Sequence, residues 1–131
     1  MAGSMIDFGL VVLIWLVQLI IYPGFAYCDR SSFISWHRKY MWLVSFIVAP
    51  LMLSQLLLKA YLLYISTDWQ TGTSLLLVFL TWIHTFLRAV PLHNKLNIKG
   101  NEPALVENLV RINWIRTAAW TVIWLLGILT W

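Results

Sequence analysis

The sequence contains few charged residues and a single cysteine, and both shortages narrow the class of protein. Only 11% of the 131 residues are charged, whereas 61% are hydrophobic, and the mean hydropathy is +0.80. A water-soluble domain has about 25% charged residues, so these charges are too few to cover the surface of a soluble fold. Cys28 is alone, which excludes an intrachain disulfide and a CxxC redox pair.

Three further patterns are missing. No Lys or Arg precedes the first apolar run, where Asp7 stands instead, so this run is not predicted to be a signal peptide. The histidines show no HxxxH, HxH or ExxH spacing, and the glutamates of a dimetal carboxylate site are missing, so no metal site is predicted. The net charge of +4 comes from basic residues that flank apolar segments, so we predict no nucleic-acid partner.

Four apolar segments are long enough to cross about 30 Å of hydrocarbon at 1.5 Å per residue. The predicted helices span about 7–26, 35–65, 73–95 and 102–130. Pro50 is expected to kink the second helix, and Asn101 is the expected N-cap of the fourth, with Pro103 in its first turn. Short loops make neighbouring helices antiparallel. We therefore predict one all-α domain, 1–131, folded as an integral membrane up-down-up-down four-helix bundle, with residues 1–4 as a cloning remnant before a native start at Met5.

The basic residues predict how the bundle is oriented. Those in the first and third loops and their flanking turns are Arg30, Arg38, Lys39, Arg88, Lys95, Lys99 and Arg111. The opposite side has Lys59, which lies inside a helix end and is expected to extend its amino group to the interface. Because basic loops stay in the cytoplasm, both termini are predicted to be non-cytoplasmic. The expected location is the inner (plasma) membrane of a bacterium, with the lipid bilayer as a partner.

Polar residues within the apolar segments recur at steps of three and four, the spacing that turns one face of a helix toward a bundle axis. The predicted inward faces are Phe8, Val11, Trp15, Gln18 and Tyr22; His37, Met41, Ser45, Val48, Met52, Gln55 and Lys59; Ser74, Leu77, Thr81, His84, Arg88, Pro91 and Lys95; and Val106, Leu109, Asn113, Arg116, Trp120, Trp124 and Gly127. Lipid cannot satisfy their polar groups, so the four faces are expected to meet. The predicted result is a vestibule open toward the cytoplasm and walled by Trp15, Trp42, Trp82, Trp114 and Trp120.

Four residues on these faces are predicted to be catalytic: His84, Arg88, Asn113 and Arg116. His84 lies mid-span, where desolvation favours a neutral imidazole that can act as a base; a hydrogen bond to Thr81 or to a neighbouring helix is the structural alternative. Arg116 stays protonated and needs an acceptor. That acceptor is a carboxylate folded inward from the rim, the anionic oxygen of a ligand, or the interface reached by snorkelling. Asn113 orients the same ligand or bonds a neighbouring helix.

Ligand-binding residues are predicted around the catalytic ones. They are Trp15, Gln18, Tyr22, His37, Met41, Ser45, Thr81, His93 and Trp120. His37 and His93 lie on facing helix ends, where an interfacial role competes with ligand binding. A b-type haem needs two axial histidines at matched depth, and the pairs that His84 forms with His37 or His93 are poorly matched.

Two segments resemble a known membrane family. Val90–Leu96 ends the third segment with Pro91, His93 and Asn94, and Leu109–Thr117 contains the run Asn-Trp-Ile-Arg-Thr. Both resemble the small four-helix membrane family that includes anthrone oxygenases, with His93 where that family usually carries asparagine. The resemblance implies oxidation of a phenolic, anthrone-like substrate by O2 without a metal or organic cofactor.

We therefore predict a small integral membrane oxidoreductase, or a protein that binds a flat, apolar phenolic, quinone-like or isoprenoid molecule in a cytoplasm-facing pocket. Proton removal by His84, with the enolate stabilised by the nearby arginines or Asn113, would give an electron-rich anion that reacts with O2. This chemistry requires no cofactor, although haem b or a quinone is compatible with the fold. The alternatives are a non-enzymatic accessory subunit of a larger membrane complex, a homo-oligomer, and a b-type haem-binding electron carrier.

Overall fold

The computed structural model describes residues 2–129, and those residues form four long helical segments with no strand. The elements are α1 Ala2–Leu16, η1 Val17–Ile21, α2 Tyr22–Gly24 and η2 Phe25–Tyr27; α3 Arg30–Ile65; α4 Trp69–His84, η3 Thr85–Ala89 and α5 Val90–Lys99; and α6 Pro103–Leu129. Each segment is long and apolar enough to cross a membrane. The predicted all-α four-helix architecture is confirmed, while the predicted end of the last helix at residue 130 lies outside the described residues.

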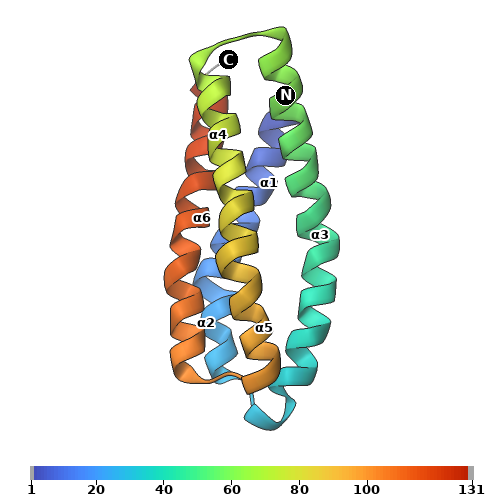
Figure 1. The fold of residues 1–131 in the computed structure, drawn as a ribbon, viewed down its shortest axis with the longest axis vertical. Helices are drawn as coiled ribbons and strands as arrows, with labels where there is room; N and C mark the ends of the chain where they lie inside the picture. The colour runs from blue at the N-terminus through green and yellow to red at the C-terminus, as the bar shows by residue number, and fades with distance from the viewer. Residues whose placement is uncertain (1, 130–131) are drawn as a thin grey trace.

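The four segments run antiparallel in chain order, as short connections require. Both termini therefore lie at the same end as the α3–α4 connection, which we call the termini end (Figure 1). The connections at 28–29 and 100–102 lie at the opposite end, which we call the basic end because Arg30, Lys95 and Lys99 are close to them in the sequence.

Two helices begin earlier than predicted because an aspartate caps each of them. α3 starts at Arg30 rather than near residue 35, and the Asp29 side chain accepts a hydrogen bond from its first turn. α4 starts at Trp69 rather than near residue 73, where Asp68 accepts from the Thr71 backbone at 2.8 Å. Hydrogen bonds from the Thr71 backbone and then from its hydroxyl hold the pKa of Asp68 below its usual range. An Asx residue before a helix satisfies N–H groups that would otherwise lack an acceptor.

The fourth helix begins at Pro103, close to the predicted start, but Asn101 is not its N-cap. The carbonyl of Glu102 accepts the first hydrogen bonds of this helix. The Asn101 amide instead donates to the carbonyls of Phe25 and Cys28 at 2.8 and 2.9 Å. Asn101 therefore ties the α5–α6 connection to the end of the first segment.

The first and third segments each contain a π-helical turn just before a proline. η1 precedes Pro23, and η3 precedes Pro91. Proline has no N–H to donate to the carbonyl four residues earlier, and its ring crowds that carbonyl. A wider π turn accommodates both effects, and such turns are often found at functional sites. Each π turn also adds a residue to a turn, which rotates the face that points inward beyond it.

The π turn η3 explains why the predicted inward face of the third segment is wrong from Arg88 onward. Ser74 and Thr81 are buried as predicted. After η3 begins, the buried residues are Ala89, Leu92, His93 and Leu96, whereas the predicted Arg88, Pro91 and Lys95 are exposed. One added residue moves the buried position from 88 to 89 and brings His93 into the core.

The predicted inward face of the first segment is wrong for two aromatic residues. Phe8 and Trp15 are exposed, and the buried positions lie one residue earlier, at Asp7 and Ile14. Gln18 and Tyr22 do point inward, as predicted. Because this segment is apolar nearly all round, with a mean hydropathy of 2.3 in its most apolar window, steps of three and four do not fix which side faces the bundle.

The middle of α3 packs less closely against the bundle than its two ends, with Met41, Val44, Val48 and Leu51 only partly buried against the core. No residue from Met41 to Leu51 is buried, although His37 and Tyr40 before this stretch and Met52 after it are. Figure 1 shows α3 along one side of the bundle, with α4 and α5 in front and α1 behind. Pro50, predicted to kink this helix, lies in the same stretch.

Candidate functional site

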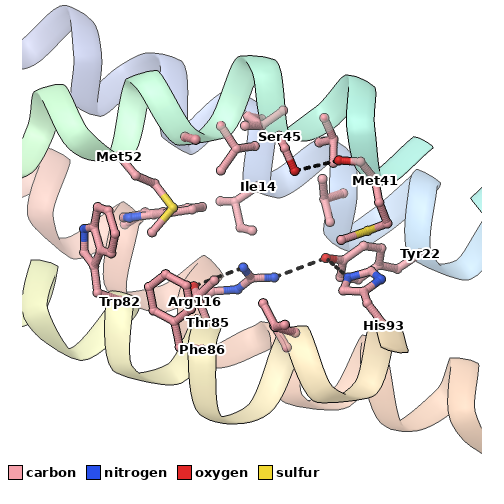
Figure 2. Close-up of a pocket in the computed structure, with 18 of the residues that line it drawn as sticks. Ile14, Tyr22, Met41, Ser45, Met52, Trp82, Thr85, Phe86, His93 and Arg116 are labelled. Carbon is pink, nitrogen blue, oxygen red and sulfur yellow. Dashed lines mark hydrogen bonds between the residues drawn. The ribbon is translucent and has the colours of Figure 1, made fainter. Parts of the chain in front are cut away.

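A cavity of about 230 Å³ lies beside this middle stretch of α3, lined also by α1, α4, η3, α5 and α6. Ser45 and Ala49 on α3 and Phe86 on η3 line the cavity and are also exposed. The cavity therefore opens at the side of the bundle, between α3 and η3. Figure 2 shows Arg116 extended along the cavity, with Trp82 toward one end and His93 toward the other.

Arg116 is the permanently charged group among the described residues that line this cavity, and it is 6% exposed. Its Nε and Nη2 donate to Oδ1 of Asn113 at 3.1 and 2.7 Å. Nη2 also donates to Oη of Tyr22 at 3.2 Å, and Nη1 donates to Oγ1 of Thr85 at 3.3 Å (Figure 2). All of these acceptors are neutral. A buried cation without a counter-ion is costly. None of the acceptors of this guanidinium carries a negative charge that would balance it.

Two of the three predicted acceptors for Arg116 are not found. Within residues 2–129 no carboxylate forms an ion pair with it, and the rim residues Asp29 and Glu107 are exposed. The side chain is buried, so it does not snorkel to the interface. The anionic oxygen of a ligand is the predicted acceptor that the geometry leaves open.

Asn113, which is itself bonded to Gln18, fixes the position of the Arg116 side chain. Nδ2 of Asn113 donates to Oε1 of Gln18 at 2.9 Å, and Oγ1 of Thr117 donates to the same oxygen at 3.0 Å. Nε2 of Gln18 donates to the Val110 carbonyl at 3.0 Å. Neither amide lines the cavity. The structure thus gives Asn113, predicted as catalytic, and Gln18, predicted as ligand-binding, a positioning role.

A chain of hydrogen bonds runs from Arg116 toward the basic end. Oη of Tyr22 and Nε2 of His93 are 2.9 Å apart, Nδ1 of His93 and Nε2 of His37 are 2.9 Å apart, and Nδ1 of His37 and Oδ1 of Asn97 are 2.6 Å apart. His37 and His93 are 0% and 4% exposed. The interfacial role considered for these histidines is therefore wrong, because both are core residues.

Aromatic rings surround the two histidines. His37 stacks on Phe33 with ring centroids 5.3 Å apart and on His93 with centroids 5.1 Å apart. Phe25 meets the edge of His37 at 5.4 Å, and Tyr40 lies 6.2 Å from it. This packing keeps water away from the hydrogen bond between the histidines.

The haem alternative paired His84 with His37 or His93, and it stays a prediction; the two histidines that the structure brings together are His37 and His93. Two imidazole nitrogens that bind one metal ion at about 2 Å each lie about 4 Å apart, whereas His37 and His93 are bonded directly at 2.9 Å. Within residues 2–129, no group of three His, Cys, Asp or Glu side chains is arranged to hold a metal ion.

His84, the predicted base, does not line the cavity. It ends α4 just before η3, and it faces the backbone of Ile112 in α6. Its predicted hydrogen bond to Thr81 is not formed, because the Thr81 hydroxyl donates to the Val78 carbonyl at 2.7 Å. Arg88 is exposed. Two of the predicted catalytic residues thus lie outside the cavity. Before the π turn the inward face of α4 already lies one position from the predicted one, at Val78 rather than Leu77, and after it the buried position is Ala89 rather than Arg88.

The predicted ligand-binding residues divide into two groups. Those that line the cavity are Tyr22, Met41, Ser45, His93 and Trp120; those that do not are Trp15, Gln18, His37 and Thr81. Of the predicted tryptophan wall, Trp82 and Trp120 line the cavity, whereas Trp15, Trp42 and Trp114 are exposed. Trp15 donates to Oγ1 of Thr121 at 3.1 Å.

Three residues of the site were not predicted: Tyr40, Thr85 and Asn97. The signal for Asn97 was present in the sequence, because His93 and Asn97 are spaced four residues apart and share a helix face. Tyr40 lies three residues after His37 on the same face of α3. Thr85 lies four residues after the buried Thr81, whose carbonyl accepts from the Thr85 hydroxyl at 2.7 Å.

Two indole N–H groups of the cavity wall have no hydrogen-bond acceptor within residues 2–129. They belong to Trp82 and Trp120. Buried donors of this kind nearly always have a partner. Arg116 is the cation of the cavity wall, and no described lining residue is a carboxylate. The cavity is therefore suited to a molecule with acceptor oxygens.

A second polar cluster lies toward the termini end. Nζ of Lys59 and Oδ2 of Asp7 form an ion pair at 2.7 Å, and Nε2 of Gln55 donates to Oδ1 of Asp7 at 2.8 Å. All three residues are buried. The prediction that Lys59 extends to the interface is thus wrong. Asp7 neutralises it, because α1 begins at Ala2 and places Asp7 inside the helix.

Comparisons with known proteins found no matching family model, no matching curated protein and no matching solved structure. The resemblance to the family of anthrone oxygenases therefore stays a prediction based on two short segments.

Proposed function

We propose that this chain is an integral membrane protein that binds a flat, lipid-soluble molecule with an acidic oxygen in the cavity beside α3. The observation that carries the proposal is Arg116, a buried cation whose acceptors are all neutral. A phenolate or enolate oxygen would supply the balancing negative charge.

In a membrane, the mouth of the cavity would lie in the bilayer. The outer surface of the bundle carries large exposed apolar side chains such as Trp42, Phe46 and Leu57, which would contact acyl chains. A molecule dissolved in the bilayer would then enter sideways between α3 and η3. We propose that the basic end is cytoplasmic, in line with the positive-inside rule; this places both termini outside and suits a bacterial inner membrane.

The size of the cavity favours a small ring system. Its volume of about 230 Å³ is below the roughly 300–1,000 Å³ of pockets that enclose drug-sized ligands. A phenolic or quinone-like head of two or three rings suits this space better than a bulky isoprenoid. Any apolar chain would extend through the mouth into the bilayer.

We propose oxidoreductase activity as the enzymatic form of this function. The Tyr22 hydroxyl, bonded to His93, lies at the cavity and would accept a proton from an acidic substrate. Arg116 would stabilise the resulting anion in a low-dielectric site. Such an electron-rich anion reacts with O2, which serves as the oxidant, so no metal or organic cofactor is required. Tyr22 and His93 thereby take the role that the sequence suggested for His84.

The alternative of an accessory subunit has less support. A polar helix face that pairs with another subunit would lie on the outside of the bundle. Gln18, Asn113 and Thr117 instead bond one another inside it. These three residues are therefore already satisfied within the chain.

Closing the mouth of the cavity tests the binding site. The probe is heptylumbelliferone, a flat phenol with an apolar chain. Ser45 lies at the mouth, and its hydroxyl donates only within its own helix, to the Met41 carbonyl at 2.6 Å. We expect Ser45→Phe to weaken probe binding by about tenfold or more, equivalent to about 1.4 kcal/mol, because the ring occupies the entrance. The measurement is a fluorescence titration of protein in lipid nanodiscs, corrected with empty nanodiscs.

Ser54→Phe is the matched control. Ser54 is exposed on the same helix and does not line the cavity, so its replacement should leave the affinity unchanged. The methyl ether of the probe, which has no acidic oxygen, should bind more weakly than the phenol. Equal affinities for the wild type and both variants would contradict the proposed site.

A further inference from the structure

We propose that Tyr22, His93 and His37 form a proton relay that connects the cavity to Asn97 near the basic end. The inference rests on the proposed function, because the relay needs an acidic molecule in the cavity. It adds a path for the proton and a restriction on the chemistry of the substrate. Tyr22 and His93 line the cavity, whereas His37 and Asn97 continue the chain away from it.

The hydrogen bonds give the relay a single direction. Oδ1 of Asn97 only accepts, so the proton of a neutral His37 is on Nδ1, and its Nε2 must accept. Nδ1 of His93 therefore donates to His37, and Nε2 of His93 accepts from the Tyr22 hydroxyl. The Tyr22 oxygen in turn accepts from Arg116, which has no lone pair to offer. Every proton in the chain points from the cavity toward Asn97.

One proton can leave the cavity by short transfers along this chain. The O–H of the bound molecule passes its proton to Oη of Tyr22 while the Tyr22 proton moves to Nε2 of His93. The proton on Nδ1 of His93 moves to Nε2 of His37, and the proton on Nδ1 of His37 passes to water beside the half-buried Asn97. The result is an anion next to Arg116 and one proton released near the basic end. No electron moves in this step.

The relay carries one proton outward and then one proton inward, and it does not carry successive protons in the same direction. After one outward transfer the hydrogen bonds point the opposite way, with the Asn97 amide turned so that its NH2 group donates. The chain can then carry the next proton only inward, unless an imidazole ring turns over. Stacking of His37 between Phe33 and His93 opposes that rotation. The relay therefore suits a substrate that loses a proton and later regains one, such as a phenol or a carbon acid.

The surroundings of the relay support proton transfer in two ways. The ring of Phe33 lies nearly parallel to His37, at 25°, and Phe25 meets it edge-on at 82°. These rings exclude water, and an aromatic face also attracts the transient imidazolium. The charged group that faces the chain is Arg116 on α6, and the other titratable group against it is Tyr40 on α3. Arg116 stabilises the Tyr22 oxygen when its proton moves.

Nitrogen NMR tests the direction of the relay directly. We expect both His37 and His93 to be neutral with the proton on Nδ1 and a bare Nε2, in protein labelled at histidine and held in lipid nanodiscs. Single-histidine replacements assign the signals. A proton on Nε2 of either residue in the resting protein would overturn the assigned direction.

His37→Gln separates proton transfer from binding, because His37 does not line the cavity. Glutamine can replace hydrogen bonds but cannot release a proton near neutral pH. We expect the variant to bind heptylumbelliferone like the wild type, while protonation of the bound probe slows by about 100-fold, the lower end of the range for positioned acid–base groups. The measurement is a stopped-flow pH jump, since the neutral and anionic probe absorb at different wavelengths.

Two asparagine variants complete the test. Asn97→Ala removes the end of the relay and should also slow protonation, whereas Asn94→Ala, exposed one turn earlier on the same helix, should not. If the wild type fails to bind the probe, the proposed function is wrong. If binding is intact and both His37→Gln and Asn97→Ala exchange protons at the wild-type rate, the relay is wrong and the binding site stands. Should His37→Gln not fold, Asn97→Ala and the NMR measurement decide.

Discussion

Replacing Arg116 with methionine is expected to weaken the binding of heptylumbelliferone by about 30-fold or more without lowering the stability of the fold. Loss of one member of a buried charge pair costs about 2–5 kcal/mol of binding free energy, and 2 kcal/mol corresponds to about 30-fold. The fold itself should not suffer, because the wild type already has a buried cation whose acceptors are all neutral. Removal of this charge relieves the cost of keeping a cation out of water, which offsets the loss of the hydrogen bonds to Asn113, Tyr22 and Thr85.

The measurement is the same nanodisc titration, accompanied by thermal unfolding. Arg111→Met is the matched control, since Arg111 is exposed on the same helix, donates to Asn108 at 2.9 Å and does not line the cavity. Arg116→Lys keeps the charge and should bind with intermediate affinity. An unchanged affinity in Arg116→Met would show that no anionic oxygen is held at this guanidinium.

Breaking the ion pair between Lys59 and Asp7 is expected to have the largest effect on stability. Lys59→Met leaves a buried carboxylate, and Asp7→Asn leaves a buried ammonium, so each variant should lose about 3–5 kcal/mol of unfolding free energy. The double variant has no buried charge, and the asparagine can still accept from Gln55, whose amide donates at 2.8 Å in the wild type. We expect the double variant to be close to the wild type.

Reversible unfolding in mixed micelles would measure these differences as a double-mutant cycle. Lys39→Met, at an exposed position on the same helix, should change the stability little. Additive losses in the double variant would contradict the pairing. They would mean instead that each side chain is solvated separately.

The number and direction of the helices could be predicted from the sequence because apolar length and short loops determine them. The same applies to the inward face of α6, where Asn113 and Arg116 lie on one side with the buried Val106, Leu109 and Trp120 and so mark the side that must be covered. Their meeting with Gln18 followed from the high cost of polar groups in hydrocarbon. These features depend on local chemistry that is visible in a single chain.

The rest of the site depends on geometry that the sequence does not show. A π turn shifts every later residue around its helix, so Arg88 was predicted to face inward and His93 was placed at the surface. His84 lies before that turn, where the buried face of α4 is set by Val78 rather than by the predicted Leu77. The role of Asp7 was missed because the helix starts at Ala2, which buries this carboxylate opposite Lys59. Pairing between distant segments decides such contacts, and no periodicity within one segment reports it.

The contacts that hold α3 in the bundle affect the range of molecules that can enter the cavity. Within residues 2–129, side-chain hydrogen bonds and an ion pair join this helix to its neighbours near both ends: His37 bonds α5 near one end, and Gln55 with Lys59 bonds α1 near the other. Pro50 lies between these anchors, where the helix lacks one backbone hydrogen bond. The helix can therefore bow outward between its two anchors without breaking either of them. Ligands of different width could then bind in the cavity, with the loss of some van der Waals contacts between α3 and the rest of the bundle.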